Sequence, residues 1–129
     1  MIVASNSAVQ TLAPGQSIVF DVTIMSNECS CCIRRSSVKL TRRGVHTITF
    51  SGNIGSTTED TEAELSIEVG GETLPETRMI STSTAAGELN NVSTTTKYNV
   101  CCSSFSVVKV TNTGTTSVNV DANSSLVVD

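Results

Sequence analysis

The sequence predicts an all-β protein, an antiparallel sandwich or barrel of about eight to ten strands with little or no helix. Three observations lead to this fold class. Hydrophobic residues recur at every second position in several segments, which places them on one face of a strand. Turn signals rich in glycine, proline and asparagine separate these segments at short intervals. No segment shows the sustained apolar period of 3.6 residues that an amphipathic helix requires.

The first half of the chain contains the clearest strand and turn signals. Residues 1–12 predict an N-terminal arm or edge strand, and one domain covers residues 13–129. A turn at 13–16 is indicated by Pro14 and Gly15, because proline presets φ and glycine accepts positive φ. The segments expected next are a strand over 17–25 with Ile18, Phe20, Val22 and Ile24 on one face, a loop over 26–35, a strand over 36–42, a break at Arg43-Gly44, and a strand over 45–51.

The second half continues the same alternation. A polar connection is expected over 52–60, because glycines stand at Gly52 and Gly55. The next strand, over 61–69, has Ala63, Leu65, Ile67 and Val69 on one face, and Gly70-Gly71 predicts a hairpin. The remaining segments are expected to be a weaker strand over 72–83, a loop over 84–91, strands over 92–102 and 105–111, a turn over 112–114, and strands over 117–122 and 126–128.

Composition and charge exclude several classes of function. The net charge of −4 argues against nucleic-acid binding. No apolar run approaches the ~20 residues of a membrane span, and the first residues lack a secretory signal pattern. The sixteen valines and 38 serines and threonines are typical of an extracellular or virion β-protein. We therefore expect synthesis in a host cytoplasm and residence in a virion.

Residue patterns that carry catalysis are not found in the sequence. There is no glycine-rich phosphate loop, no Gly-x-Ser-x-Gly elbow and no dinucleotide-binding fingerprint. The single histidine, His46, has no recognisable partner pattern for thiol or acid–base chemistry. We expect a protein that is not an enzyme and uses no cofactor.

Five cysteines form two clusters, and three interpretations of them stay open. Neighbouring cysteines are poor disulfide partners, because adjacent Cα atoms are only ~3.8 Å apart. Bridges between the clusters are geometrically reasonable and would leave one thiol over, since five is odd. Reduced structural thiols are the second interpretation. The third is a metal site with His46 as a further ligand, although the spacing differs from that of common zinc motifs. The candidate residues are Cys29, Cys31, Cys32, Cys101 and Cys102.

The order of several segments resembles a known family. The matching stretches are Pro14-Gly15-Gln16 with Ile18 and Phe20, the run from Arg43 to Phe50, Leu65 and Ile67 leading into Gly70-Gly71-Glu72, the run from Val108 to Asn112, and the run from Ser125 to Val128. Together they resemble the tumour necrosis factor-like and complement-type globular head domains and their bacterial and phage relatives. The resemblance extends over roughly residues 10 to 128.

The resemblance implies a jelly-roll sandwich that assembles as a homotrimer. Such domains usually carry an aromatic residue two positions after the glycine that matches Gly44, and this chain has His46 there. We expect the subunit contact to include His46, Ile48, Phe50 and Tyr98. The leading hypothesis is a non-enzymatic phage virion component, such as a head fibre or capsid decoration protein, whose partners are itself and another virion or surface protein. The alternative hypothesis is a receptor- or carbohydrate-binding tip module.

Two charged stretches complete the sequence-level predictions. A basic stretch contains Arg34, Arg35, Lys39, Arg42 and Arg43. Glutamates at 62, 64 and 68 alternate with apolar residues, which indicates a solvated outer face. We hypothesise that the basic and acidic stretches meet across a subunit interface.

Overall fold

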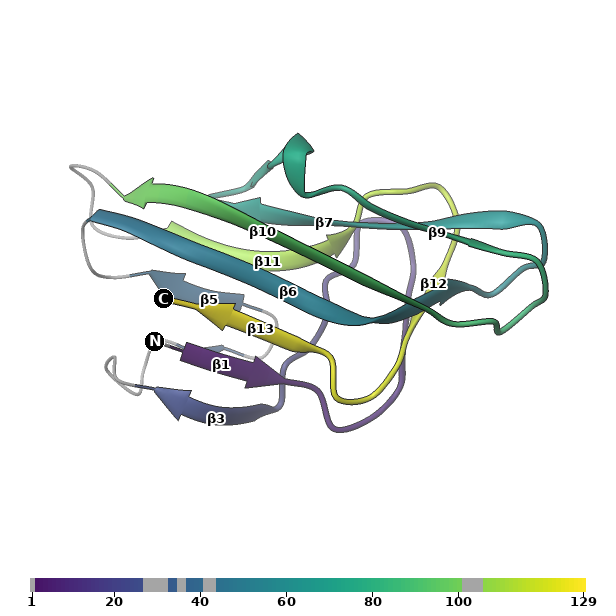
Figure 1. Ribbon diagram of the computed structural model, residues 1–129, viewed down its shortest axis with the longest axis horizontal. Helices are drawn as coiled ribbons and strands as arrows, with labels where there is room; N and C mark the ends of the chain where they lie inside the picture. The colour runs from purple at the N-terminus through teal and green to yellow at the C-terminus, as the bar shows by residue number, and fades with distance from the viewer. Residues whose placement is uncertain (1, 27–32, 35–36, 41–43, 101–105) are drawn as a thin grey trace.

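The structure is a computed structural model that describes residues 2–26, 33–34, 37–40, 44–100 and 106–129. It is a sandwich of two antiparallel sheets (Figure 1), as the sequence predicts. Sheet A has the order β2 (Gln10–Leu12), β12 (Val118–Val120), β6 (Gly44–Ser56), β13 (Ser125–Val128), β1 (Ile2–Ser5) and β3 (Val22–Ser26). β12 and β13 pair with different parts of one edge of the long strand β6, and β10 (Asn90–Val100) pairs along its opposite edge.

Sheet B packs against sheet A. Its strands have the order β4 (Ile33–Arg34), β5 (Ser37–Leu40), β11 (Ser106–Asn112), β7 (Thr61–Val69) and β8 (Glu72–Thr73), and β9 (Met79–Ser83) also pairs with β7. A single 3₁₀ turn, η2 (Pro75–Thr77), is the one helical element in the described part of the chain. The prediction of little or no helix is therefore confirmed.

The hydrophobic core lies between the two sheets and is built from the alternating residues. Sheet A contributes Ile48, Phe50 and Leu126, and sheet B contributes Leu65 and Ile67, all without solvent exposure. Valine supplies much of the remaining core volume, since branching at Cβ suits the pleated surface. A thin core of small side chains fills the space between the sheets.

The strand expected over 17–25 is interrupted because the chain changes sheets there. Ser17 forms an isolated bridge with Thr111 of β11, and the Ile18 amide donates to the Val110 carbonyl at 2.9 Å. The chain then crosses to sheet A, where β3 begins at Val22 and pairs with β1. The alternation fails at this point, since Val22 is partly exposed. Alternation of apolar residues within a segment does not show that the chain changes sheets, because the change depends on pairing with strands distant in sequence.

The polar connection expected over 52–60 is confined to 57–60, because β6 continues through both glycines to Ser56. A Cβ atom at Gly52 would lie 2.4 Å from Ser124 Oγ, and one at Gly55 would lie 1.8 Å from the Glu88 carbonyl oxygen. These glycines allow close approach of neighbouring chain segments rather than a turn. The strand is therefore longer than the spacing of its glycines suggests.

The hairpin at Gly70-Gly71 is confirmed, and the strand expected after it is broken. Both glycines have positive φ, 63° and 86°, and β7 pairs with β8 across them. Pro75 then begins η2. The Thr77 side chain, rather than a neighbouring strand, then hydrogen-bonds to the backbone of β7. The Thr77 hydroxyl accepts the Ile67 amide at 2.9 Å and donates to the Leu74 carbonyl at 2.6 Å.

Residues 1–12 divide between the interior and the edge of sheet A. β1 lies between β13 and β3, and Ile2 and Ala4 belong to the core. β2 is an edge strand that pairs with β12. Ile2 is paired with Val128, so the two ends of the chain lie close together (Figure 1).

Candidate assembly face and polar sites

The residues expected at a subunit contact lie on the inner face of sheet A. Ile48 and Phe50 have no exposed surface in the single chain, and His46 is only 5% exposed. Tyr98 is opposite His46 on β10 and is half-buried against the core. Ile48 and Phe50 therefore fill the sandwich of one chain and present no surface to a second copy, which corrects that part of the prediction.

The opposite face of the same strands points to solvent. We define the sheet-A outer face by residues of β1, β6, β10 and β13 that alternate with the core and are exposed or half-buried. These residues are Val3, Val45, Thr47, Thr49, Ser51, Ser93, Thr95, Lys97, Asn99, Ser125 and Val127. Lys97 is the charged member of the set, and the exposed Asp129, just after β13, lies opposite Thr47 at its rim.

Cross-strand pairs order the sheet-A outer face into rows. Val3 is opposite Val127, Val127 is opposite Thr49, and Thr49 is opposite Thr95. The hydroxyls of Thr49 and Thr95 are 3.2 Å apart and hydrogen-bonded. Val45 is 64% exposed on this face. The result is a surface of methyl and hydroxyl groups that a partner can cover without removing many charges from water.

The outer face of sheet B differs in charge. Lys39 lies opposite Val107, Lys109 lies opposite Glu68, and two further glutamates of β7 also point outward. The solvated acidic face predicted for 61–69 is confirmed. Of the basic stretch, Lys39 is placed on this face, while Arg35, Arg42 and Arg43 lie outside the described residues, as does the side chain of Arg34. The proposed contact between the basic and acidic stretches stays a prediction.

β10 is the last strand of sheet A on its side, and η2 and β9 lie beside part of it, with Thr96 donating to Glu76 at 3.3 Å and Asn90 donating to Ser81 at 3.1 Å. Over its eleven residues β10 pairs with β6, and it has no second strand partner in the described part of the chain. Proteins commonly protect such edges with charges, proline or a covering segment. On β10 the charge is limited to Lys97, and η2 and β9 cover part of its edge, so only the rest of this edge is open to a partner.

A polar cluster lies on the sheet-B outer face around Glu64. Its Oε1 accepts from Arg78 Nε at 2.7 Å, and its Oε2 accepts from the Thr113 hydroxyl at 2.6 Å. The Thr113 oxygen lies 3.0 Å from the Ser66 hydroxyl, which must donate to it because Thr113 gives its own proton to Glu64. The Thr113 hydrogen bond and then Arg78 lower the pKa of Glu64, and burial opposes them.

Replacing Glu64 with glutamine is expected to remove an acid-sensitive part of the stability. A carboxylate whose folded pKa is lowered stabilises the protein above its unfolded pKa, and this contribution is lost as pH falls through the folded value. Wild type should exceed Glu64→Gln by about 1 kcal/mol at pH 7. The difference should shrink as pH falls from 7 through the lowered pKa and vanish below it, as measured by urea unfolding over a series of pH values. A difference that does not change along the series would contradict this assignment.

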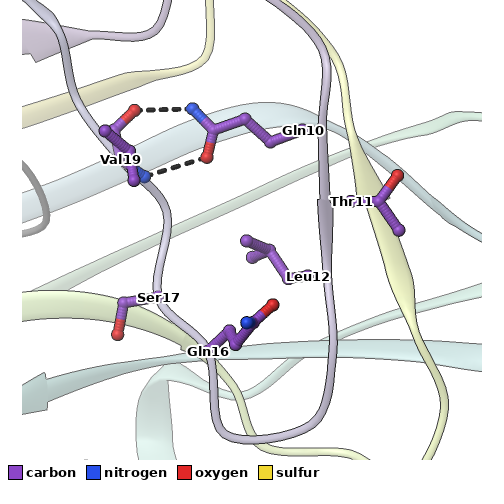
Figure 2. A pocket seen from close by; sticks show the side chains of 6 residues that line it. All are labelled: Gln10, Thr11, Leu12, Gln16, Ser17 and Val19. Carbon is purple, nitrogen blue, oxygen red and sulfur yellow. Dashed lines mark hydrogen bonds between the residues drawn. The ribbon is translucent and has the colours of Figure 1, made fainter.

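A shallow hollow of about 590 Å³ lies where the chain turns from β2 towards sheet B. Figure 2 shows the Gln10 side chain reaching across it to Val19. The amide donates to the Val19 carbonyl at 2.6 Å and accepts the Val19 amide at 2.9 Å. This pair reproduces a β-bridge with a side chain and ties the edge of sheet A to the segment that has joined sheet B.

Neither a metal-binding cluster nor a membrane-spanning helix is found among the residues that the structure describes. No group of three or more His, Cys, Asp or Glu side chains among them could hold a metal ion. No helix in the same residues is long and apolar enough to cross a membrane. All five cysteines lie outside the described residues, so the disulfide, thiol and metal interpretations stay predictions.

Comparison with solved structures places this architecture among known folds. The globular domain of zebrafish complement 1qA aligns with a TM-score of 0.68 and 8% identity over 98% of this chain and 94% of that one. Eiger TNF from S. frugiperda aligns at 0.67 and 12% identity over 98% and 90%. The chain has a complement- and TNF-like jelly-roll fold. Murine APRIL also aligns, at 0.58 and 8% identity over 94% and 98%.

These similarities concern the fold, because the identities are low. No protein-family model matches the sequence, and no curated protein matches it. The resemblance seen in the order of sequence segments is therefore supported at the level of the jelly-roll fold, and its bacterial or phage part stays a prediction.

Sequence reasoning missed the sheet-A outer face. Its residues are threonine, serine and valine, types that are common on any solvated strand. A usable signal was present, since 45–51 alternates uncharged residues outside with core residues inside, whereas 61–69 alternates glutamates with its core residues. The difference in charge between two otherwise similar strands separates the two faces.

Proposed function

We propose that this protein is a non-enzymatic structural protein that assembles as a homotrimer through the sheet-A outer face. The observation that carries the proposal is the contrast between its two surfaces. The sheet-A outer face has few charges, Lys97 and Asp129 on either side of Thr47, whereas the outer face of sheet B carries several lysines and glutamates. Interface centres are depleted in charge relative to the remaining surface, so sheet A provides the better assembly surface.

The part of the β10 edge that η2 and β9 leave uncovered supplies the second half of the contact. An edge of one copy that packs against the face of the next makes a contact between two different surfaces. Such a contact closes into a ring when the rotation allows, and three copies would form a closed trimer. Complement- and TNF-like folds typically form homotrimers, and the fold similarity supports this number of copies.

We further propose that the protein is displayed on the surface of a particle, and that this particle is a phage virion. The composition supports it, since serine, threonine and valine dominate and catalytic sequence patterns are missing. Recovery of peptides of this chain in density-purified particles would test the display. Recovery only from the soluble fraction would contradict it.

Replacing Thr49 with glutamate is expected to dissociate the trimer. Thr49 lies in the middle row of the sheet-A outer face, between Val127 and Thr95. Assembly would bury an unpaired carboxylate there, at a cost of several kcal/mol. Native mass measurement at micromolar concentration should show a trimer for wild type, with and without reductant, and a monomer for Thr49→Glu.

The matched control is Thr82→Glu. Thr82 is exposed on β9 of sheet B, so the same substitution there should leave the trimer intact. Far-ultraviolet circular dichroism should be unchanged in both variants, since both side chains point to solvent. A wild-type monomer under both conditions would overturn the trimer, and a trimeric Thr49→Glu would overturn the choice of face.

A further inference from the structure

The polar cluster around Glu64 borders a hollow of about 250 Å³ on the outer face of sheet B. Strand β7, the residue between η2 and β9, and the loop between β11 and β12 form its walls, all within a single chain. The hollow lies on the outer face of sheet B, and the proposed assembly face lies on sheet A. The lining residues are Glu62, Glu64, Arg78, Thr113, Gly114 and Thr115.

The loop between β11 and β12 is held in place by side-chain hydrogen bonds. The Asn112 side chain accepts the Gly114 amide at 3.0 Å and donates to the Thr116 carbonyl at 2.8 Å. The Thr116 hydroxyl donates to the Glu62 carbonyl at 2.7 Å, which fastens the loop to β7. The wall of the hollow is therefore organised before any ligand arrives, which lowers the entropy cost of binding.

Gly114 brings the loop close to Glu64. A Cβ atom at Gly114 would lie 3.1 Å from the Glu64 Cβ, tighter than ordinary contact. The small residue therefore lets Thr113 reach the Glu64 carboxylate and leaves Thr115 at the rim.

Arg78 is oriented by the same carboxylate. Its Nε donates to Glu64, which holds the guanidinium beside that carboxylate. Nε is the guanidinium atom that hydrogen-bonds within the described residues. The Arg78 side chain is 55% exposed, against 16% for Glu64, and it lines the hollow.

The charges around the hollow select the class of ligand. Glu62 and Glu64 repel an anion, and Arg78 repels a metal cation. A neutral molecule avoids both penalties and can use the groups that remain. The Arg78 N–H groups donate, the exposed Glu62 carboxylate accepts, and the Thr115 hydroxyl does either.

We propose that this hollow binds a neutral saccharide through adjacent hydroxyl groups. Neighbouring hydroxyls of a sugar ring accept from the Arg78 guanidinium and donate to the Glu62 carboxylate. No aromatic residue lines the hollow, so stacking does not contribute, and a single site should bind with a dissociation constant of about 1–10 mM. The site is independent of the proposed assembly, which would only raise the apparent affinity through multivalency.

The test is an NMR titration of the folded full-length chain with glucose, galactose, mannose and N-acetylglucosamine up to 200 mM. Saturable shifts of the Arg78, Gly114 and Thr115 amides with at least one sugar are expected. Arg78→Lys keeps the charge and loses the paired terminal N–H groups, so its affinity should fall at least tenfold. Lys109→Met removes a cation on the same face outside the hollow and should bind like wild type.

Three outcomes would overturn the proposal. The first is the lack of a saturable shift with every sugar, and the second is saturable shifts that lie elsewhere on the chain. The third is saturation of the same amides by sodium sulfate but not by sugars, which would make the ligand an anion. Binding equal to wild type in a folded Arg78→Lys variant would remove Arg78 from the site.

Discussion

Replacing Phe50 with alanine is expected to cost about 3–5 kcal/mol of unfolding free energy. Phe50 is the largest fully buried side chain of the described residues and lies at the centre of β6. Its removal forfeits the transfer free energy of the ring and leaves a cavity that two hydrogen-bonded sheets cannot close. A domain of this size has about 5–15 kcal/mol in total, so the variant should be marginal or unfolded at 37 °C.

Urea unfolding followed by circular dichroism measures this effect, since the chain has no tryptophan. Protein concentration must be held constant, because assembly would make the apparent stability depend on it. Val9→Ala is the matched control: Val9 is also apolar but largely exposed, and its loss should change stability by less than about 0.5 kcal/mol. Equal stabilities for Phe50→Ala and wild type would contradict the placement of Phe50 in the core.

Gly55→Ala is expected to destabilise the protein by at least about 2 kcal/mol. The added Cβ would meet the Glu88 carbonyl oxygen at 1.8 Å and its carbon at 2.9 Å. Both are backbone atoms, so no side-chain rotation relieves the overlap, and the loop before β10 must move. That movement would disrupt the buried contact in which the Ser83 hydroxyl accepts the Ser56 amide at 3.0 Å and donates to the Glu88 carbonyl at 3.2 Å.

Comparing Gly71→Ala with Gly55→Ala distinguishes the stability cost of backbone strain from the stability cost of steric overlap. Gly71 has φ of +86° and open space around its Cβ position, so alanine there should cost about 1–2 kcal/mol through left-handed strain alone. Thermal unfolding should rank wild type above Gly71→Ala and Gly71→Ala above Gly55→Ala. The reverse order of the two variants would show that loop 84–89 yields easily and that Gly55 is not a packing requirement.

The two sheets illustrate how far local patterns reach. The strand over 61–69 was predicted with the bounds that it has, because alternation and a double-glycine hairpin are local properties. Ile48 and Phe50 were predicted to lie at a subunit contact, but both are fully buried between the two sheets of a single chain. Alternation separates two faces of a strand, and a core residue and an interface residue are both apolar, so composition alone does not distinguish them.

By itself, the sequence determined the fold class of this protein, because side-chain alternation and turn residues act within a few positions of the chain. The tertiary structure alone decided what the glycines of β6 do, where the chain crosses between sheets, and which residues surround Glu64. Each of these depends on partners distant in sequence, such as Ser124 over Gly52, Val110 beside Ile18 and Thr113 against Glu64. Such contacts arise when the two sheets pack, and no short window of sequence contains them.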